Sequence, residues 1–143
     1  MNIKIYTDGA CSGNPGIGGW GGVIIIPEKN PIYLNGGKNF TTNNQMELLA
    51  AINVLKYFND SKNITIYTDS KYVMNGIEVW IDNWKKNGWK TSTKKSVKNQ
   101  NLWEELDNQI SKHNIKWEWV KGHSGNRYNE IADELARKYI EDI

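Results

Sequence analysis

The sequence lacks the features of secreted and membrane proteins. Cys11 is the only cysteine among 143 residues, so no internal disulfide can form. We therefore expect the reducing environment of the cytoplasm. No apolar run approaches the roughly 20 residues that a membrane-spanning helix needs, so we expect no membrane partner. The first strand pattern begins at Ile3, and for that reason we expect no signal peptide.

The chain also lacks a strong net charge, since the formal value is only +2. The charge is nevertheless uneven, because the segment 80–99 holds a single acid, Asp82, among its lysines. Three tryptophans, Trp80, Trp84 and Trp89, alternate with these lysines. The lysines of this segment are Lys85, Lys86, Lys90, Lys94, Lys95 and Lys98. A basic segment interleaved with aromatic residues is typical of a contact with a nucleic-acid backbone.

One hexapeptide occurs twice in nearly identical form. Residues 3–8 read IKIYTD and residues 64–69 read ITIYTD, and both have the alternation and β-branched content of strands. If these strands pair in parallel and in register, Asp8 and Asp69 lie side by side at the carboxyl edge of a sheet, where ligands of open α/β sheets bind. Two adjacent carboxylates repel unless they share a proton or a cation. The repeat therefore predicts a metal site.

The order of the elements predicts one α/β domain over residues 1–143. We expect strands at 3–8, 20–27, 32–40, 64–69 and 115–120. We expect helices at 43–58, 70–80, 100–112 and 127–142, with a short basic helix and loop forming a protrusion at about 80–99. Short connections make the first three strands antiparallel, and alternating strands and helices follow. This pattern indicates a five-stranded mixed sheet, three strands antiparallel and then two parallel, flanked by helices.

The expected helix 43–58, with Thr42 or Asn43 as its N-cap, has almost no polar face, and Glu47 is its only acid. A buried carboxylate is costly unless it is paired or bound to a cation. The alternative is a capping role in the first turn. Beside Asp8 and Asp69, we favour a metal ligand.

Two further candidates lie near the end of the chain. At 100° per residue, Asp133 falls on the edge of the apolar face of the helix 127–142, and Glu134 points away. Taken singly, Asp133 resembles a surface acid more than a ligand. His123 lies between Gly122 and Gly125 in the loop after the last strand, which suits a mobile group that transfers protons.

All these candidate ligands are hard oxygen donors, and the sequence has no Cys/His cluster of the kind that binds zinc. Carboxylates with open positions suit Mg²⁺, with Mn²⁺ as a substitute. Four carboxylates also balance the charge of two divalent ions, the arrangement found in two-metal nucleases.

Together these segments resemble type 1 ribonuclease H over essentially the whole chain. The matching motifs, in the family's order, are 6–9 (YTDG), 42–48 (TNNQMEL), 68–70 (TDS), 80–91, 122–125 (GHSG) and 133–136 (DELA). The resemblance implies the ribonuclease H-like fold and an endonuclease that cleaves the RNA strand of RNA–DNA hybrids, giving 5′-phosphate and 3′-hydroxyl ends. It also implies four metal-binding catalytic acids, and a histidine that assists proton transfer or product release. These residues are Asp8, Glu47, Asp69, Asp133 and, as the histidine, His123.

The resemblance also implies where the hybrid binds. Minor-groove contacts, including those to ribose hydroxyls, fall on Asn14, Asn43 and Asn44, whose amides both donate and accept hydrogen bonds. Further matches are a DNA-phosphate pocket at Thr42 and Asn99, a DNA channel at Tyr72, Trp80 and Ser92, and a protrusion with Trp84, Lys85, Lys86 and Lys90. No separate hybrid-binding domain is expected before Met1. We expect a monomer that acts in RNA primer removal and R-loop clearance.

Two other functions remain open. A DNA-cutting nuclease of the same broad fold shares the acids, but it does not predict the His123 loop, the asparagines and the tryptophan–lysine segment together. A binding module that has lost activity is the second. Loss of an acid would favour that module, and all four acids are present.

Overall fold

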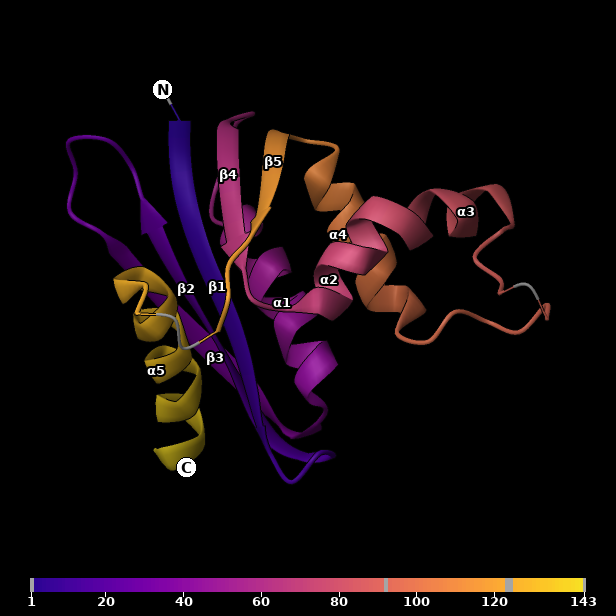
Figure 1. Cartoon of the computed structure of the whole chain (residues 1–143), viewed down its shortest axis with the longest axis horizontal. Coiled ribbons are helices and arrows are strands. Elements are labelled where there is room, and N and C mark those ends of the chain that lie inside the picture. The colour runs from indigo at the N-terminus through magenta and orange to yellow at the C-terminus, as the bar shows by residue number, and fades with distance from the viewer. Residues whose placement is uncertain (1, 92, 123–124, 143) are drawn as a thin grey trace.

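A single mixed sheet organises the molecule (Figure 1). The computed structural model describes residues 2–91, 93–122 and 125–142. Its strands lie in the order β3-β2-β1-β4-β5. Their bounds are β1 (Asn2–Ser12), β2 (Gly16–Ile25), β3 (Ile32–Thr41), β4 (Asn63–Thr68) and β5 (Asn114–Trp119). β1 pairs with β2 and β2 pairs with β3 in antiparallel fashion, whereas β1 pairs with β4 and β4 pairs with β5 in parallel. This arrangement confirms the predicted fold class.

The two hexapeptides pair in parallel and in register, as predicted. Ile3 lies opposite Ile64, and the pairing continues without a shift to Thr7 opposite Thr68. The prediction that the first strand ends at Asp8 is wrong. β1 continues to Ser12, because β2 supplies an antiparallel partner as far as its Ile17. Asp8 therefore lies where the parallel pairing ends but still inside a continuous strand.

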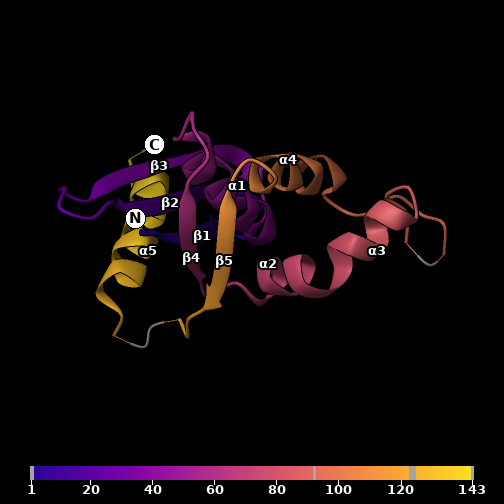
Figure 2. The same ribbon diagram turned by 90° about the horizontal axis from the view of Figure 1, so that it is seen from above.

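Helices cover both faces of the sheet (Figure 2). Their bounds are α1 (Asn43–Lys56), α2 (Lys71–Asn75), η1 (Gly76–Trp80), α3 (Ile81–Lys86), α4 (Gln100–Ile110) and α5 (Arg127–Glu141). α1 packs on β1 and β2 with α4 beside it, and α5 packs on the opposite face. Within the described part of the chain, no helix has both the length and the apolar character needed to cross a membrane.

The predicted helix 70–80 is interrupted. After α2 the chain forms one π-helical turn, η1, before α3 begins. At Gly76 a Cβ atom would lie only 1.9 Å from the ring of Trp103. A glycine is therefore needed at this position, because the fully buried Trp103 packs directly on the backbone.

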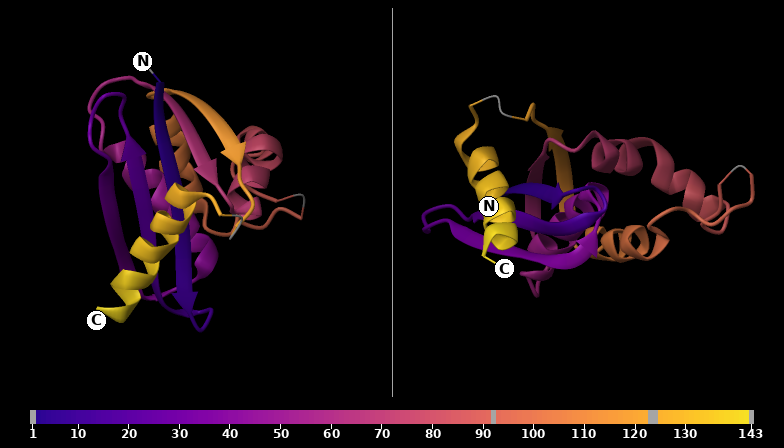
Figure 3. Two further views of the ribbon diagram at one scale, coloured as in Figure 1. Left: turned by 60° about the vertical axis from the view of Figure 1, so that its left-hand side comes forward. Right: turned by 90° about the horizontal axis from the view of Figure 1, so that it is seen from below.

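The segment 80–99 projects away from the sheet, as Figures 1 and 3 show. Its base is aromatic: the ring of Trp84 lies 5.7 Å from that of Trp80, 5.4 Å from that of Trp103 and 6.3 Å from that of Trp89. Aromatic pairs at these separations add stability beyond that of their buried area. The protrusion is therefore tied to the core through tryptophan packing.

Packing differs on the two faces. The face toward α1 carries the larger core, formed mainly by aliphatic residues of the sheet and α1. The face toward α5 is narrow because glycines of β2 replace side chains. At Gly21 a Cβ would lie 2.2 Å from the carbonyl oxygen of Ala132, and at Gly19 one would lie 2.1 Å from that of Ala136. The backbone of α5 thus rests directly on the sheet.

This close approach gives a prediction for stability. Gly21→Ala should lower the free energy of unfolding by about 1–3 kcal/mol, because the added methyl group has no space between β2 and α5. Urea unfolding followed by circular dichroism measures the change. The control is Ser61→Ala on an exposed loop, which should stay within about 0.5 kcal/mol of wild type. Equal unfolding midpoints for both variants would contradict the packing described.

Candidate active site

Three carboxylates meet at the edge of the sheet where the β1–β4 pairing ends. Asp8 belongs to β1, Glu47 to α1, and Asp69 follows β4 directly. One oxygen from each lies within 4.8 Å of the others. Asp8 and Glu47 are only 6% and 5% exposed, whereas Asp69 is half-buried. The structure thus brings together three of the four predicted acids, and we call this group the acid cluster.

Two glycines allow the acid cluster to form. At Gly9 a Cβ would lie 2.6 Å from the backbone nitrogen of Glu47, so the missing side chain lets α1 approach β1. The Gly9 N–H also donates to Asp8 Oδ1 at 2.9 Å, which orients that carboxylate. At Gly122 a Cβ would lie 2.8 Å from Asp69 Oδ2. Both glycines lie within the motifs that match ribonuclease H, but nothing in their spacing along the chain predicts these contacts.

Glu47 is not a capping residue. Thr42 is the N-cap of α1, and its Oγ1 accepts a hydrogen bond from the Gln45 N–H at 3.2 Å. Gln45, not Glu47, therefore occupies the capping-box position. Glu47 Oε1 is buried, and it has no hydrogen-bond partner among the described residues. A buried acceptor without a partner, next to two other carboxylates, fits a ligand of a hard cation.

Burial and crowding shift the protonation of the acid cluster. Burial, followed by the charges of Asp69 and Asp133, raises the pKa of Asp8 from 3.8 to about 8. Burial, followed by the charges of Asp8 and Asp69, raises the pKa of Glu47 well above its ordinary value. Protons therefore occupy the metal-free cluster at neutral pH, and a divalent cation bound there would displace them.

The fourth predicted acid lies at the border of this group. Asp133 is on α5, with a side chain 21% exposed, on the edge of the apolar face as the sequence predicted. Its charge contributes to the raised pKa of Asp8, so the two carboxylates interact. Its Oδ2 accepts a hydrogen bond from Arg137 Nε at 3.0 Å. Asp133 is therefore adjacent to the acid cluster but paired with a cation of its own helix.

Several predicted substrate contacts are neighbours in the structure. The Asn43 N–H donates to Asn14 Oδ1 at 3.1 Å, which ties the β1–β2 turn to the start of α1. Asn44, the next residue of α1, is exposed. Gln45 Nε2 donates a hydrogen bond to Asn99 Oδ1 at 3.1 Å, and the backbone N–H of Gln45 donates one to Oγ1 of the N-cap Thr42. Gln45, which the sequence analysis did not single out, thus joins the two residues of the predicted phosphate pocket.

The same network reaches the predicted DNA channel. Asn99 Nδ2 donates to the Tyr72 hydroxyl at 3.1 Å, and Trp103 Nε1 donates to it at 3.0 Å. The ring of Tyr72 lies 5.8 Å from that of Trp80. Ser92, predicted for this channel, and His123 lie outside the described residues.

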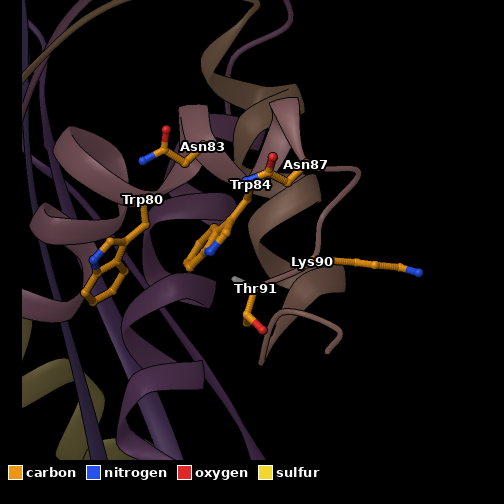
Figure 4. Close-up of a pocket in the computed structure, with 6 residues that line it drawn as sticks. All are labelled: Trp80, Asn83, Trp84, Asn87, Lys90 and Thr91. Atoms are coloured by element: carbon orange, nitrogen blue, oxygen red, sulfur yellow. The ribbon is translucent and has the colours of Figure 1, made fainter. Parts of the chain in front are cut away.

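The protrusion carries a hollow of about 460 Å³ (Figure 4). Trp80, Trp84 and Lys90 line it, as does a polar set that the sequence analysis missed. This set is Asn83, Asn87 and Thr91. Lys86 is exposed, whereas Lys85 forms an ion pair with Asp107 of α4 at 3.3 Å. The predicted lysines therefore differ in their availability to a ligand.

Known proteins resemble this chain over nearly its full length. The family model described as RNase H matches residues 1–141. The ribonuclease H of Francisella philomiragia is 56% identical, covering 99% of this chain and 93% of that protein. The ribonuclease H of Wolbachia pipientis wMel is 61% identical, with coverage of 98% and 96%.

Solved structures agree with these relatives. LC9-RNase H1, a type 1 RNase H with the type 2 active-site motif, superposes with a TM-score of 0.86 at 28% identity, covering 99% of this chain and 72% of that one. LC11-RNase H1, solved in complex with an RNA/DNA hybrid, gives 0.72 at 22% identity, with coverage of 98% and 97%. At 22% identity the latter similarity supports the fold.

The raised pKa of Asp8 gives a prediction with a defined sign. Between pH 4 and pH 8 the folded chain keeps a proton on Asp8 that the unfolded chain releases. The free energy of unfolding of the metal-free protein should therefore fall as pH rises through this range. Asp8→Asn removes this loss, and at pH 8 it should be more stable than wild type by at least about 1 kcal/mol.

Urea unfolding in a chelator at pH 4 and pH 8 measures this difference. Asp60→Asn, which makes the same substitution on an exposed loop, is the matched control. The stabilisation by Asp8→Asn should be present at pH 8 and nearly absent at pH 4. A parallel pH dependence for wild type and Asp8→Asn would show that Asp8 is not the group responsible.

Proposed function

The chain belongs to the ribonuclease H family, and from this membership we propose that it is an endonuclease that hydrolyses the RNA strand of RNA–DNA hybrids. The products are 5′-phosphate and 3′-hydroxyl ends. The observation that carries the proposal is the acid cluster: three carboxylates that share one small space at the edge of the sheet. A site of this kind attracts divalent cations and the phosphate oxygens that accompany them.

Ribonucleases H depend on divalent metal ions, and the acid cluster can hold one. We assign the ligands to Asp8, Glu47, Asp69 and, on the more exposed side, Asp133. Oxygen donors with open positions favour Mg²⁺, with Mn²⁺ as a substitute. A pair of such ions, when bound, activates a water molecule and stabilises the leaving oxygen of the phosphodiester.

The chain's own residues prepare this site in different ways. Asp8 and Glu47 are buried on a strand and a helix, so their carboxylates are held in place before substrate arrives. Asp69 and Asp133 are more exposed, so their carboxylates can lie on the side of the site that faces the substrate. His123, by resemblance, transfers a proton or assists product release.

Selection of the hybrid falls to the surfaces beside the acid cluster. Asn14, Asn43 and Asn44 offer amides to ribose hydroxyls, the groups that distinguish RNA from DNA. For the DNA strand we assign the phosphate pocket to Thr42 and Asn99, which Gln45 joins. The hollow of the protrusion suits the sugar–phosphate backbone, because Trp80, Trp84 and Lys90 line it. We assign the chain, as a cytoplasmic monomer, to RNA primer removal and R-loop clearance.

The first prediction concerns the reaction. With Mg²⁺, the wild-type chain should cut the RNA strand of a strand-labelled hybrid and leave the DNA strand intact. Asp69→Asn should retain less than about a tenth of the activity, since loss of a metal ligand costs more than the roughly 10²-fold minimum of a lost general acid or base. Asp60→Asn is the control and should act like wild type.

The other outcomes of this assay identify the competing functions. Cleavage of double-stranded DNA at a comparable rate would indicate a DNA-cutting nuclease of the same fold. Binding of the hybrid without cleavage in the presence of Mg²⁺ or Mn²⁺ would indicate an inactive binding module.

The second prediction concerns the protrusion. Lys90→Ala and Lys86→Ala should raise KM and leave kcat nearly unchanged, because these lysines lie far from the acid cluster in the chain. Each lost phosphate contact should reduce the slope of log K against log salt by about 0.7–0.9. Lys85→Ala should have a smaller effect, since Asp107 already pairs with Lys85.

Steady-state kinetics at two salt concentrations tests this assignment, with Lys4→Ala as the control. Lys4 is an exposed lysine near the start of β1. If kcat falls while KM and the salt slope stay constant, the protrusion takes part in the chemistry and the assignment is wrong.

A further inference from the structure

The candidate ligand Asp133 differs from the other three acids because it already has a cationic partner. Arg137 Nε lies 3.0 Å from Asp133 Oδ2, one helical turn further along α5. Asp133 does not belong to the group of oxygens within 4.8 Å of one another that the described residues form. In the metal-free chain, the carboxylate is therefore held by Arg137 at the border of the acid cluster.

Arg137 stands in a strongly acidic environment. It lines a hollow of about 390 Å³ together with Asp133, Glu130 and Glu134, and of the described residues that line this hollow it is the only cation. The hydrogen bond to Asp133 raises the pKa of Arg137 most, and the charges of Asp133, Glu141 and Glu134 add to it. The guanidinium therefore compensates negative charge on the same side of the molecule that must receive a metal ion.

We propose that Arg137 is a positioning residue that holds Asp133 off the acid cluster until a divalent metal ion binds, and thereby sets the affinity for that ion. The inference rests on the proposed function, because it takes Asp133 as a ligand. On metal binding, Asp133 exchanges the Arg137 N–H for the cation. The positive charge of the Arg137 guanidinium also repels the bound ion.

The geometry makes this exchange readily reversible. The two side chains are 51% and 21% exposed, and ion pairs of this exposure and i,i+4 spacing are weak. A divalent cation among three other carboxylates competes with such a pair easily. Arg137 should therefore lower metal affinity by a small factor, not prevent binding.

Calorimetric titration of Mg²⁺ into the metal-free protein tests the proposal. Arg137→Gln should bind Mg²⁺ about two- to fivefold more tightly than wild type, the range expected from losing one weak ion pair and one nearby charge. Lys138→Gln removes the same charge from the next residue, which lines a different hollow, and it should stay close to wild type. Arg137→Lys, which can still pair with Asp133, should restore much of the wild-type affinity.

A double-mutant cycle separates the pair from general electrostatics. In an Asp133→Asn background, Arg137→Gln should give a clearly smaller gain, because the carboxylate that Arg137 holds is gone and only the repulsion between the guanidinium and the ion remains. An equal gain in both backgrounds would overturn the proposal, since the gain would then come from charge alone. Weaker Mg²⁺ binding by Arg137→Gln would also overturn it, because Arg137 would then be orienting Asp133 for the metal.

Hybrid cleavage by the wild-type chain, measured in parallel, distinguishes failure of the Arg137 role from failure of the proposed function. A wild type that cleaves hybrid with Mg²⁺, while Arg137→Gln titrates as wild type does, overturns the role of Arg137 alone. A wild type that neither binds Mg²⁺ nor cleaves the hybrid overturns the proposed function, and the role of Arg137 with it.

Discussion

The in-register pairing of β1 with β4 is the constraint on which the rest of the site depends. It places two aspartates at the end of neighbouring parallel strands, where their charges repel. Burial makes the charges of Asp8 and Glu47 still more costly, and it is the largest cause of the raised pKa of each carboxyl. This crowding lowers local stability, and it gives a group of carboxylate oxygens that could hold a divalent cation.

The acid cluster and the protrusion are held in place in different ways. The acid cluster rests on the longest strand and the most buried helix, so its geometry is fixed by the core. The protrusion is attached through the tryptophans at its base, and its lysines extend from a short helix and loop. Hydrogen bonds from Gln45 to Asn99 and from Asn99 to Tyr72 link α1, which carries Glu47, to the end of the segment 80–99 and to α2.

Local sequence predicted the fold and the proximity of Asp8, Glu47 and Asp69, because repetition and periodicity are local signals. It failed where a distant partner decides the structure. β1 continues beyond Asp8 only because β2 pairs with it, and the helix after Asp69 is interrupted where Trp103 packs on Gly76. The capping alternative for Glu47 and the partner of Lys85 are likewise settled by neighbours that spacing along the chain does not reveal.

The separate attachment of the protrusion has an evolutionary consequence. The segment 80–99 enters and leaves the body through α2 and α4, which lie side by side near the edge of the sheet (Figure 1). Under the proposed function, substitutions within it would change how long a duplex remains bound without moving any carboxylate. Selection can therefore adapt a ribonuclease of this kind to different salt conditions or competing nucleic acids by altering about twenty residues, while the inherited catalytic edge stays the same.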